Sequence, residues 1–466
     1  PHMESIHLVR PGVEEVYGLL GPYLAKGLND CGNVRILISE VKMAKSQTVA
    51  TWFTSNFSDR ERDRRWHMTR DFLKERELDA LLVLGSAAGD VSRYLLGNWL
   101  SGTVIFPMKG EPILMAAALQ QMLTITPETP KDERPWIKDV RTGARGAMIV
   151  AALKEKGLER SHIGVIGLTS GGAHPEGGIS YATWDRVLKR LPDCKFEDVG
   201  NDYDEKVMFV KSDEELVHVR RAAQVLEQAG TEIVKVIRPG VSELDVLIAM
   251  GKTMLESGFV PRFTQFGSGP NTVSPRPLWV SGEGQFFGTI GAPRVLQPGD
   301  IFITEMMASS KELGAQLQLC VAIPPVPSVF TECAKLARRC YEEALRTMRP
   351  GKTFEEVVNA MEKPLDRPDN WYVTPLIHSL NPQICVGPTG MHIERMPGVE
   401  NFPQVGTGHI RGGEIVLEPG MVFAVEPDVC IGDKRVLIGG NVVVTKNEPE
   451  ELNKVSTEMR IAGGGK

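Results

Sequence analysis

The stretch 299–323 constrains the fold of this 466-residue chain more than any other. The apolar run Ile301–Ile303 leads to a carboxylate at Glu305, a polar Ser-Ser-Lys turn follows, and a second strand-like run covers Gly314–Ile323. Apolar runs bounded by turn residues favour strands over helices. The sequence therefore predicts a β-hairpin that brings Glu305 and Gln316 close together on neighbouring strands.

Length and composition limit the class of protein. A chain of 466 residues is long enough for two domains, each with its own core. The content of 42% hydrophobic and 24% charged residues is ordinary for a soluble globular protein. The formal net charge of −6 gives no excess of basic residues of the kind that binds nucleic acid. No apolar run reaches the length of a membrane span. We therefore expect neither nucleic acid nor a membrane as a partner.

The cysteines and the start of the chain bear on its location. The seven cysteines are scattered without a CxxC pair, which favours reduced thiols over a disulfide framework or a structural zinc site. The first three residues, Pro-His-Met, look like a remnant of cloning, and no signal-peptide pattern follows them. We therefore expect a cytoplasmic protein.

The first half of the chain predicts an extension followed by an α/β domain. Residues 1–58 form the extension, and their apolar content argues against disorder. Residues 59–207 alternate helix and strand, beginning with a charged helix over 62–76 and a Val/Leu-rich strand over 78–84. The glycine-rich run 170–178 lacks a phosphate-binding motif and is interpreted as a surface loop.

A second domain is predicted over residues 208–466. Ser212 and Glu215 form a capping box that opens a long helix. An Arg-Pro-Gly turn occurs at 238–243 and again at 349–355. In both places one residue follows the turn, then Ser or Thr, and an acidic residue comes shortly afterwards. Each turn separates two helices, so the pattern indicates a duplication with two pseudo-symmetric halves.

With these elements in order, the chain resembles the creatinase/aminopeptidase P family over residues 59–450. The markers of this resemblance are Lys211-Ser-Asp-Glu-Glu215, Gly269-Pro-Asn271, Gly299-Asp300 with its hairpin, Pro375-Leu-Ile-His378, Glu418-Pro-Gly-Met-Val-Phe-Ala-Val-Glu426-Pro427 and Val442-Val-Val-Thr445. The resemblance implies an α/β (α+β) protein: a creatinase-like N-terminal α/β domain and a C-terminal pita-bread domain with pseudo-two-fold symmetry. It also implies a homodimer with shared active sites.

The same resemblance implies positions for metal ligands. Peptidases of the family hold two divalent ions with two Asp, one His and two Glu, and these positions fall on Glu305, Gln316, His378, Glu426 and Gly439. Two hard divalent ions need several anionic oxygens, yet Gln316 and Gly439 carry no charge. We therefore expect no cofactor. A single divalent ion on Glu305, His378 and Glu426 is the alternative.

The retained ionisable residues are candidates for catalysis. Carboxylates clustered without a metal repel one another, which raises the pKa of at least one towards neutrality and suits Glu305, His378 and Glu426 to acid/base chemistry. Cys385 takes the position of a second family histidine and is a candidate nucleophile if His378 lies close to it. A buried, inert thiol is the plainer interpretation of Cys385.

Four residues are candidates for substrate binding. Arg276 takes the position of another family histidine; its guanidinium stays protonated and suits an anion rather than a base. Gln316 lies among the candidate catalytic groups. Trp99 occupies an N-terminal loop that in the family can enter the partner's site, although simple packing explains it equally. His392 belongs to a polar cluster that a surface loop also explains.

Together these features predict a creatinase-like hydrolase or lyase that acts on a C–N or related bond of a small molecule. It would work by general acid/base catalysis, without metal or with a single ion. One alternative is an Xaa-Pro-type metallopeptidase with altered ligands, against which the two lost ligand positions weigh. The other is a non-catalytic binding module on the same fold, against which the retained His378 and Glu426 weigh.

Overall fold

The computed structural model describes most of the chain after residue 56. The described residues are 57–463, apart from 86–88, 99, 117, 124, 127, 130–133, 144, 170–176, 262–263, 271–279, 283–284, 288–292, 311–312, 373–374, 383–386, 390–391 and 402–408. They belong to one compact unit, Phe53–Lys466. Nearly all of the predicted extension, residues 1–58, therefore lies outside the described residues, and the predicted division at residue 207 stays a prediction.

A six-stranded mixed sheet forms the centre of the N-terminal α/β region, in the order β4-β3-β2-β1-β5-β6. Strand β1 pairs antiparallel with β2 and parallel with β5. The strands are β1 (Ala80–Val83), β2 (Gly102–Pro107), β3 (Ile113–Ala116), β4 (Asp139–Thr142), β5 (His162–Ile166) and β6 (Lys195–Asp198). The predicted alternation of helix and strand is confirmed.

Helices cover both faces of this sheet because its central strand is apolar on both sides. Leu81 and Val83 belong to the core beneath α4 (Asp59–Glu75) and α5 (Gly89–Leu96). Ala80 and Leu82 belong to the core beneath α7 (Gly146–Glu155) and α8 (Tyr181–Arg190). Successive side chains of a strand point to opposite faces, which gives three layers. Shorter helices are α6 (Leu119–Met122), α9 (Gly200–Tyr203) and a π-helix over Asp204–Met208.

A buried ionic cluster joins α4 to α10 (Asp213–Val236), the first helix of the C-terminal domain. Arg65 Nε donates to Glu61 Oε1 at 2.7 Å, and its guanidinium lies 3.2 Å from Glu215. Arg64 also reaches Glu215, at 2.8 Å. The guanidinium carbon of Arg65 lies 4.0, 4.5 and 5.5 Å from the ring centroids of Phe57, Tyr94 and Trp136. Glu215 thus completes the predicted capping box and anchors the two regions to each other.

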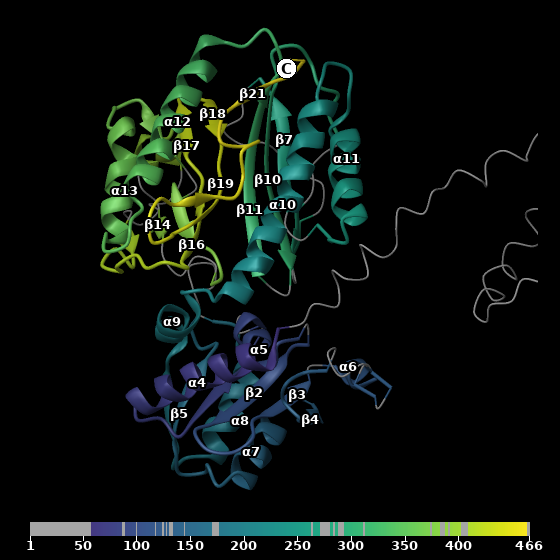
Figure 1. Cartoon of the computed structure of the whole chain (residues 1–466), viewed down its shortest axis with the longest axis vertical. Helices are drawn as coiled ribbons and strands as arrows, with labels where there is room; N and C mark the ends of the chain where they lie inside the picture. The colour runs from purple at the N-terminus through teal and green to yellow at the C-terminus, as the bar shows by residue number, and fades with distance from the viewer. Residues whose placement is uncertain are drawn as a thin grey trace, which may run out of the picture. The chain divides into compact units, whose positions relative to one another are not determined.

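Two pairs of helices flank the strands of the C-terminal domain (Figure 1). Helices α10 and α11 (Glu243–Glu256) pack on one side, and α12 (Ser328–Thr347) and α13 (Phe354–Glu362) pack on the other. Ser242 and Thr353 cap α11 and α13, and each closes a capping box three residues later. The two Arg-Pro-Gly turns therefore have the same structure, as the duplication predicted.

The strands of the C-terminal domain form several small sheets. The first two have the orders β21-β11-β10-β7 and β13-β16-β19-β20, and a third has the order β12-β17-β18. The hairpins β8–β9 and β14–β15 are separate. The strands are β7 (Thr264–Gly269), β8 (Val280–Gly282), β9 (Gln285–Phe287), β10 (Ile301–Ser310), β11 (Leu313–Ala322), β12 (Asn370–Trp371), β13 (Ile377–Ser379), β14 (Gly387–Thr389), β15 (His409–Arg411), β16 (Val422–Val425), β17 (Asp428–Ile431), β18 (Lys434–Leu437), β19 (Gly440–Val443), β20 (Glu450–Glu451) and β21 (Arg460–Ile461).

The predicted hairpin is confirmed, but its turn was placed too early. Ser309 and Ser310 still belong to β10 and pair with Gly314 and Leu313 of β11. Continuing the antiparallel ladder satisfies their backbone groups, which outweighs the preference of serine for turns. The side chain of Ser310 is held as well, since its hydroxyl lies 2.9 Å from Nδ1 of His218 on α10.

The two halves of the domain share a longer repeat than the Arg-Pro-Gly turns. The pattern Val-Leu-x-Pro-Gly-x-x-Phe-x-x-Glu occurs at 295–305 and again at 416–426. Its glycines, Gly299 and Gly420, both have positive φ (88° and 100°), and each amide donates to a carbonyl at 2.9 Å. Glu305 is therefore equivalent to Glu426 in the two halves.

The halves meet at one pair of reciprocal backbone hydrogen bonds. Gln318 N donates to Gly439 O at 3.2 Å, and Gly439 N donates to Gln318 O at 3.1 Å. Both residues lie at the same distance along the chain from their repeat glutamates, so each half presents the same position to the other. This contact brings the two repeat glutamates towards one place.

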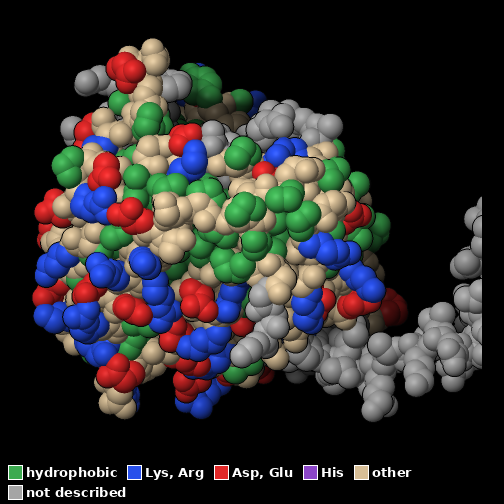
Figure 2. Space-filling view, turned by 90° about the horizontal axis from the view of Figure 1, so that it is seen from above, with side chains coloured by type: hydrophobic (Ala, Val, Ile, Leu, Met, Phe, Trp, Pro, Cys, Tyr) green, Lys and Arg blue, Asp and Glu red, His purple; other side chains and the backbone are tan. Residues whose placement is uncertain are grey.

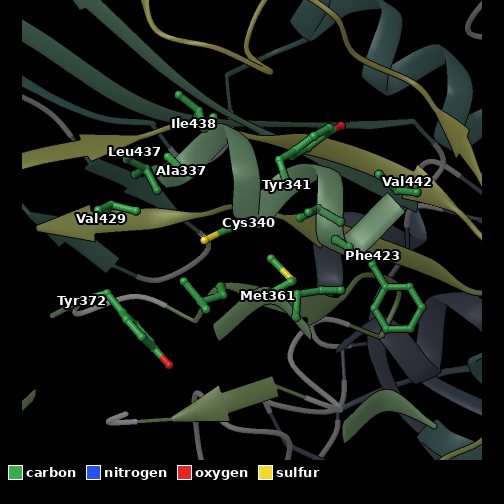
Figure 3. Close-up of a cluster of buried hydrophobic side chains, with 14 of the residues drawn as sticks. Ala337, Cys340, Tyr341, Met361, Tyr372, Phe423, Val429, Leu437, Ile438 and Val442 are labelled. Carbon is green, nitrogen blue, oxygen red and sulfur yellow. The ribbon is translucent and has the colours of Figure 1, made fainter. Parts of the chain in front are cut away.

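A large apolar core packs around α12 (Figure 3). Cys340 and Tyr341 of α12 meet Met361 of α13 and Phe423 of β16 in this core. On the face in Figure 2, Lys and Arg side chains are interspersed with Asp and Glu rather than gathered by sign. None of the helices among the described residues has the length and hydropathy that a membrane span requires.

The cluster around Arg65 gives a test of how the α/β region is attached. Replacing Arg65 by Met leaves the carboxylates of Glu61 and Glu215 buried with Arg64 as their remaining partner. We expect the free energy of unfolding to fall by about 3 kcal/mol, because a buried charge loses its closest partner. Urea unfolding measures the change.

The matched control is Arg62→Met on the same helix, whose partners Asp59 and Asp63 are exposed. Exposed ion pairs contribute about 1 kcal/mol or less, so this variant should unfold almost like the parent. Equal losses in the two variants would contradict a special role for Arg65.

Candidate functional site

Strand alternation places three polar side chains on one face of the β10–β11 hairpin. Ile301 and Ile303 of β10 belong to the core around α12, and Glu305 is the next residue on that face. On β11, Cys320 and Ala322 belong to the same core, so Gln318 and Gln316 continue their row. The apolar row of each strand thus changes to polar residues at the same level.

The amide of Gln316 lies between two carboxylates. Its Nε2 donates to Glu305 Oε1 at 2.9 Å and to Glu426 Oε2 at 2.9 Å. The predicted proximity of Glu305 and Gln316 is therefore present, although the direct partner of Glu305 across the ladder is Gln318. Gln318 Nε2 also donates to Glu426 Oε2. Gln316 and Gln318 are buried, with exposed fractions of 2% and 0%.

His378 reaches the same carboxylate from β13. Its Nδ1 lies 2.8 Å from the carbonyl of Ser379, and its Nε2 lies 3.2 Å from Glu426 Oε1. A carbonyl only accepts hydrogen bonds, so Nδ1 carries a hydrogen. The contact between Nε2 and Glu426 then requires a proton of its own. We call Glu305, Gln316, Gln318, His378 and Glu426 the central site.

Burial and charge act in opposite directions on the pair His378 and Glu426. Burial lowers the pKa of His378, but the charge of Glu426 and the hydrogen bonds to Glu426 and Ser379 outweigh it, and the pKa is raised. Burial raises the pKa of Glu426, and the charge of His378 offsets only part of that shift. Both shifts favour a proton held between the two side chains.

Glu305 holds a second proton. Burial, and then the negative charge of Glu426, raise the pKa of Glu305 to about 8. Because Gln316 donates to Oε1, the proton of the neutral carboxyl belongs on Oε2. Among the described residues Oε2 has no hydrogen-bond partner. The prediction that clustered carboxylates shift a pKa therefore agrees with this geometry, with burial as the larger cause.

A buried ion pair borders the central site. Arg435 of β18 binds both oxygens of Asp428 on β17, at 2.6 and 3.0 Å. Both charges act on Glu305 and Glu426. The fixed charge of Arg435 balances Asp428, and protonated His378 balances Glu426. Glu305 is then the carboxyl without a cation of its own in this group, so nothing cancels the effect of burial that keeps it neutral.

The residues present do not fit a pair of metal ions. At the ligand position Gly439, φ is 145°, a conformation that side chains rarely adopt. A Cβ atom there would lie 2.1 Å from Val425 O and 2.7 Å from Glu426 Cα, so the backbone leaves no room for a glutamate. At the other altered position, Gln316 directs N–H donors at the carboxylates. Among the described residues, no group of three His, Cys, Asp or Glu side chains is arranged to hold a metal ion.

Of the remaining predicted site residues, His392 is the one that the structure describes. Arg276, Cys385 and Trp99 lie outside the described residues, so their roles stay predictions. His392 is described and lies elsewhere: its Nε2 is 3.7 Å from Glu362, and its ring packs on Tyr372. No contact links it to the central site in the part of the chain that the structure describes.

Sequence reasoning missed two residues that shape the site. Gln318 follows Gln316 by two positions, so strand alternation alone was enough to place it on the same face. Asn441 of β19 accepts a hydrogen bond from Gln316 N at 2.9 Å and returns one to Gln316 O at 2.8 Å. Its contact depends on the meeting of the two halves, which no local pattern predicts.

Comparison with known proteins identifies the family. Residues 217–446 match the sequence model of metallopeptidase family M24, and this segment contains the whole central site. The chain belongs to metallopeptidase family M24. Its membership confirms the resemblance to creatinase and aminopeptidase P and places the chain among the hydrolases.

Individual M24 relatives are distant. An Xaa-Pro dipeptidase from Lactobacillus delbrueckii subsp. lactis is 23% identical over 291 residues, which are 61% of this chain and 70% of that protein. An ectoine hydrolase from Halomonas elongata is 21% identical over 310 residues, 62% of this chain and 68% of its own. The crystal structure of dipeptidase PepE from Mycobacterium ulcerans has a TM-score of 0.65 at 18% identity, covering 87% of this chain and 99% of its own. This structural likeness confirms the pita-bread fold.

The M24 comparisons do not support the expectation that the protein works without metal, because the family is one of metallopeptidases. The departure from the family lies in this chain's own residues, above all Gln316 and Gly439. Among the solved structures, the likeness concerns the fold alone.

The backbone at Gly439 gives a second testable prediction. We expect Gly439→Ala to destabilise the protein by about 3 kcal/mol or more, since the methyl group meets Val425 O in addition to the strained φ. Thermal unfolding measures the loss. Gly351→Ala is the matched control, because Gly351 also has a positive φ (87°) but open space around its Cβ position. There only the backbone strain of about 1–2 kcal/mol remains. A harmless Gly439→Ala would show that the position tolerates a side chain.

Glu305 predicts a pH dependence of stability. Its pKa is raised from 4.5 to about 8 on folding, so between these values the folded protein keeps a proton that the unfolded chain releases. This contribution is fully present below pH 4.5 and is lost as the pH rises to about 8. The variant Glu305→Gln lacks the titration. The melting temperature of Glu305→Gln minus that of the parent should increase as the pH rises through this range. Above about pH 8 this difference should stay constant.

Glu256→Gln on α11 is the control, since the side chain of Glu256 is 68% exposed. It should follow the parent at every pH. A difference between Glu305→Gln and the parent that is independent of pH would mean that Glu305 titrates like an ordinary carboxyl.

Proposed function

We propose that this M24 protein is a hydrolase of a small molecule, which it cleaves at a C–N or related bond by general acid/base catalysis without a pair of metal ions. The observation that supports this proposal most directly is the hydrogen-bonded link from Glu305 through Gln316 to Glu426. A neutral amide stands where a metal-dependent site needs an anionic ligand. The site nevertheless keeps ionisable groups that can carry protons.

Glu305 is the group best suited to carry the proton. Its Oε2 has no partner among the described residues, whereas both oxygens of Glu426 are engaged. A pKa of about 8 lies close to the working pH, which is where a carrier gives and takes a proton most efficiently. His378 is a weaker candidate, because both ring nitrogens already have partners.

The proposed step is a hydrolysis in which one proton moves through Glu305. The ionised carboxylate takes a proton from water as the water oxygen bonds to the carbon of the substrate. The C–N bond then breaks, and the neutral carboxyl returns that proton to the departing nitrogen. The products are an acid and an amine, and Glu305 is again ionised. His378, Glu426 and the two glutamines hold Glu305 in place and set its pKa.

The location and assembly of the enzyme belong to the same proposal. We propose a homodimer with shared active sites from the family resemblance, and a cytoplasmic location from the scattered cysteines without a CxxC pair. Size-exclusion chromatography with light scattering distinguishes a dimer from a monomer.

A second candidate is an Xaa-Pro peptidase that depends on metal. The observation that favours it is the likeness to an Xaa-Pro dipeptidase. Elemental analysis of protein purified without chelator separates the candidates. Two ions per chain would favour this peptidase, one ion would point to Glu305, His378 and Glu426, and none would favour the acid/base enzyme.

The catalytic proposal predicts the pH profile of the reaction. In a screen of small amides and amidines, kcat/KM for a cleaved substrate should rise with pH, be half-maximal near pH 8 and level off above it, because the ionised form of Glu305 starts the step. Glu305→Gln should lower kcat by about 10²–10⁴-fold, the usual contribution of general acid/base catalysis. His378→Ala should also lower it, since the charge balance around Glu305 changes.

Glu232→Gln on the exposed side of α10 is the control and should keep the parental rate. A profile that falls between pH 6 and 8, or full turnover by Glu305→Gln, would contradict the role of Glu305. We expect turnover to persist after exhaustive chelation. Loss of turnover would favour the metal-dependent peptidase over the acid/base enzyme.

A further inference from the structure

Both hydrogens of the Gln316 amide nitrogen are used in the central site. One is donated to Glu305 and the other to Glu426, each over 2.9 Å. An amide nitrogen carries two hydrogens, so the donor capacity of this group is complete. Gln316 is thus the one side chain with hydrogen bonds to both repeat glutamates among the described residues.

The backbone of Gln316 is fixed independently of its side chain. Asn441 binds both its N–H and its C=O, and Asn441 is in turn held by Asn453, whose amide reaches Ala223 O on α10 at 2.9 Å. Asn441 and Asn453 are both fully buried. This chain of buried hydrogen bonds fixes the position of the Gln316 backbone, and with it the place of the side chain between the two carboxylates.

A divalent cation shared by the same two oxygens would overlap this nitrogen. Such an ion binds carboxylate oxygens at about 2.0–2.6 Å, on the line of approach that the N–H groups now take. The amide supplies two partial positive charges to the carboxylates, whereas a metal ion supplies a full double charge. The two arrangements therefore exclude each other.

We propose that the amide of Gln316 occupies the cation position between Glu305 and Glu426, and that this single side chain keeps divalent ions out of the central site. The inference deepens the proposed function by naming the residue that makes the site independent of metal. It predicts that the remaining groups, Glu305, Glu426 and His378, form a cation site once the amide is removed.

The test is a calorimetric titration with MnCl₂ of the full-length protein and its variants. Gln316→Glu keeps the shape of the side chain but replaces the donor nitrogen by an oxygen, which adds a third carboxylate. We expect it to bind one Mn²⁺ ion per chain at least about 100-fold more tightly than the parent, since affinity for hard cations follows the number of charged ligands. Adding Glu305→Gln to this variant should remove the gain.

Gln318→Glu is the matched control. Gln318 lies on the same strand and equally deep, but its amide nitrogen donates a hydrogen bond to Glu426 and none to Glu305. It should gain much less affinity than Gln316→Glu. Equal gains in the two variants, or a gain that survives Glu305→Gln, would overturn the assignment to Gln316.

Gln316→Ala keeps the test decisive if Gln316→Glu does not fold. It removes the amide without adding charge, so we expect weaker but measurable Mn²⁺ binding. Tight binding by the parent, or no gain in Gln316→Ala, would overturn the inference. These titrations do not depend on turnover: a failed substrate screen would count against the proposed hydrolase alone, and a failed titration against the role of Gln316 alone.

Discussion

The reciprocal backbone hydrogen bonds between Gln318 and Gly439 are the contact on which the C-terminal domain depends. Each half of the domain reaches this point at the same distance beyond its repeat, and each contributes the glutamate that ends the repeat. Glu305 and Glu426 therefore face each other because of the symmetry of the fold rather than through any local preference. A site at such a junction takes its groups from segments more than a hundred residues apart.

This junction also explains how the site manages its charges. Three carboxyls, the buried Glu426 and Asp428 and the partly buried Glu305, meet two cations, and burial makes an unbalanced charge expensive. Arg435 and His378 each neutralise one carboxylate, and the amides of Gln316 and Gln318 satisfy the oxygens that remain. The leftover proton resides on Glu305. In a fold shared with metallopeptidases, neutral amide donors thus satisfy carboxylate oxygens at this junction.

Much of the fold was predictable because it depends on local patterns. The capping boxes at Ser212 and Thr353 and the alternation along β10 and β11 each involve residues that are close in the sequence. They therefore predict the helices and strands from local patterns alone. The proximity of Glu305 and Gln316 followed from the hairpin. The φ of Gly439 and the bond from Asn441 to Gln316 were beyond prediction, since both arise only where the halves meet. The extension of β10 through Ser310 was missed for a related reason, because pairing with β11 determines where β10 ends.

The two altered ligand positions differ in how easily evolution can reverse them. The codons of glutamine and glutamate differ at the first base alone, so one nucleotide change at position 316 exchanges an amide for a carboxylate of the same shape. Position 439 offers no such route, because its backbone admits no side chain until the neighbouring strand moves. On the proposed role of Gln316, a lineage with this fold regains a site for one cation in a single mutational step, whereas a site for two ions requires remodelling of the main chain.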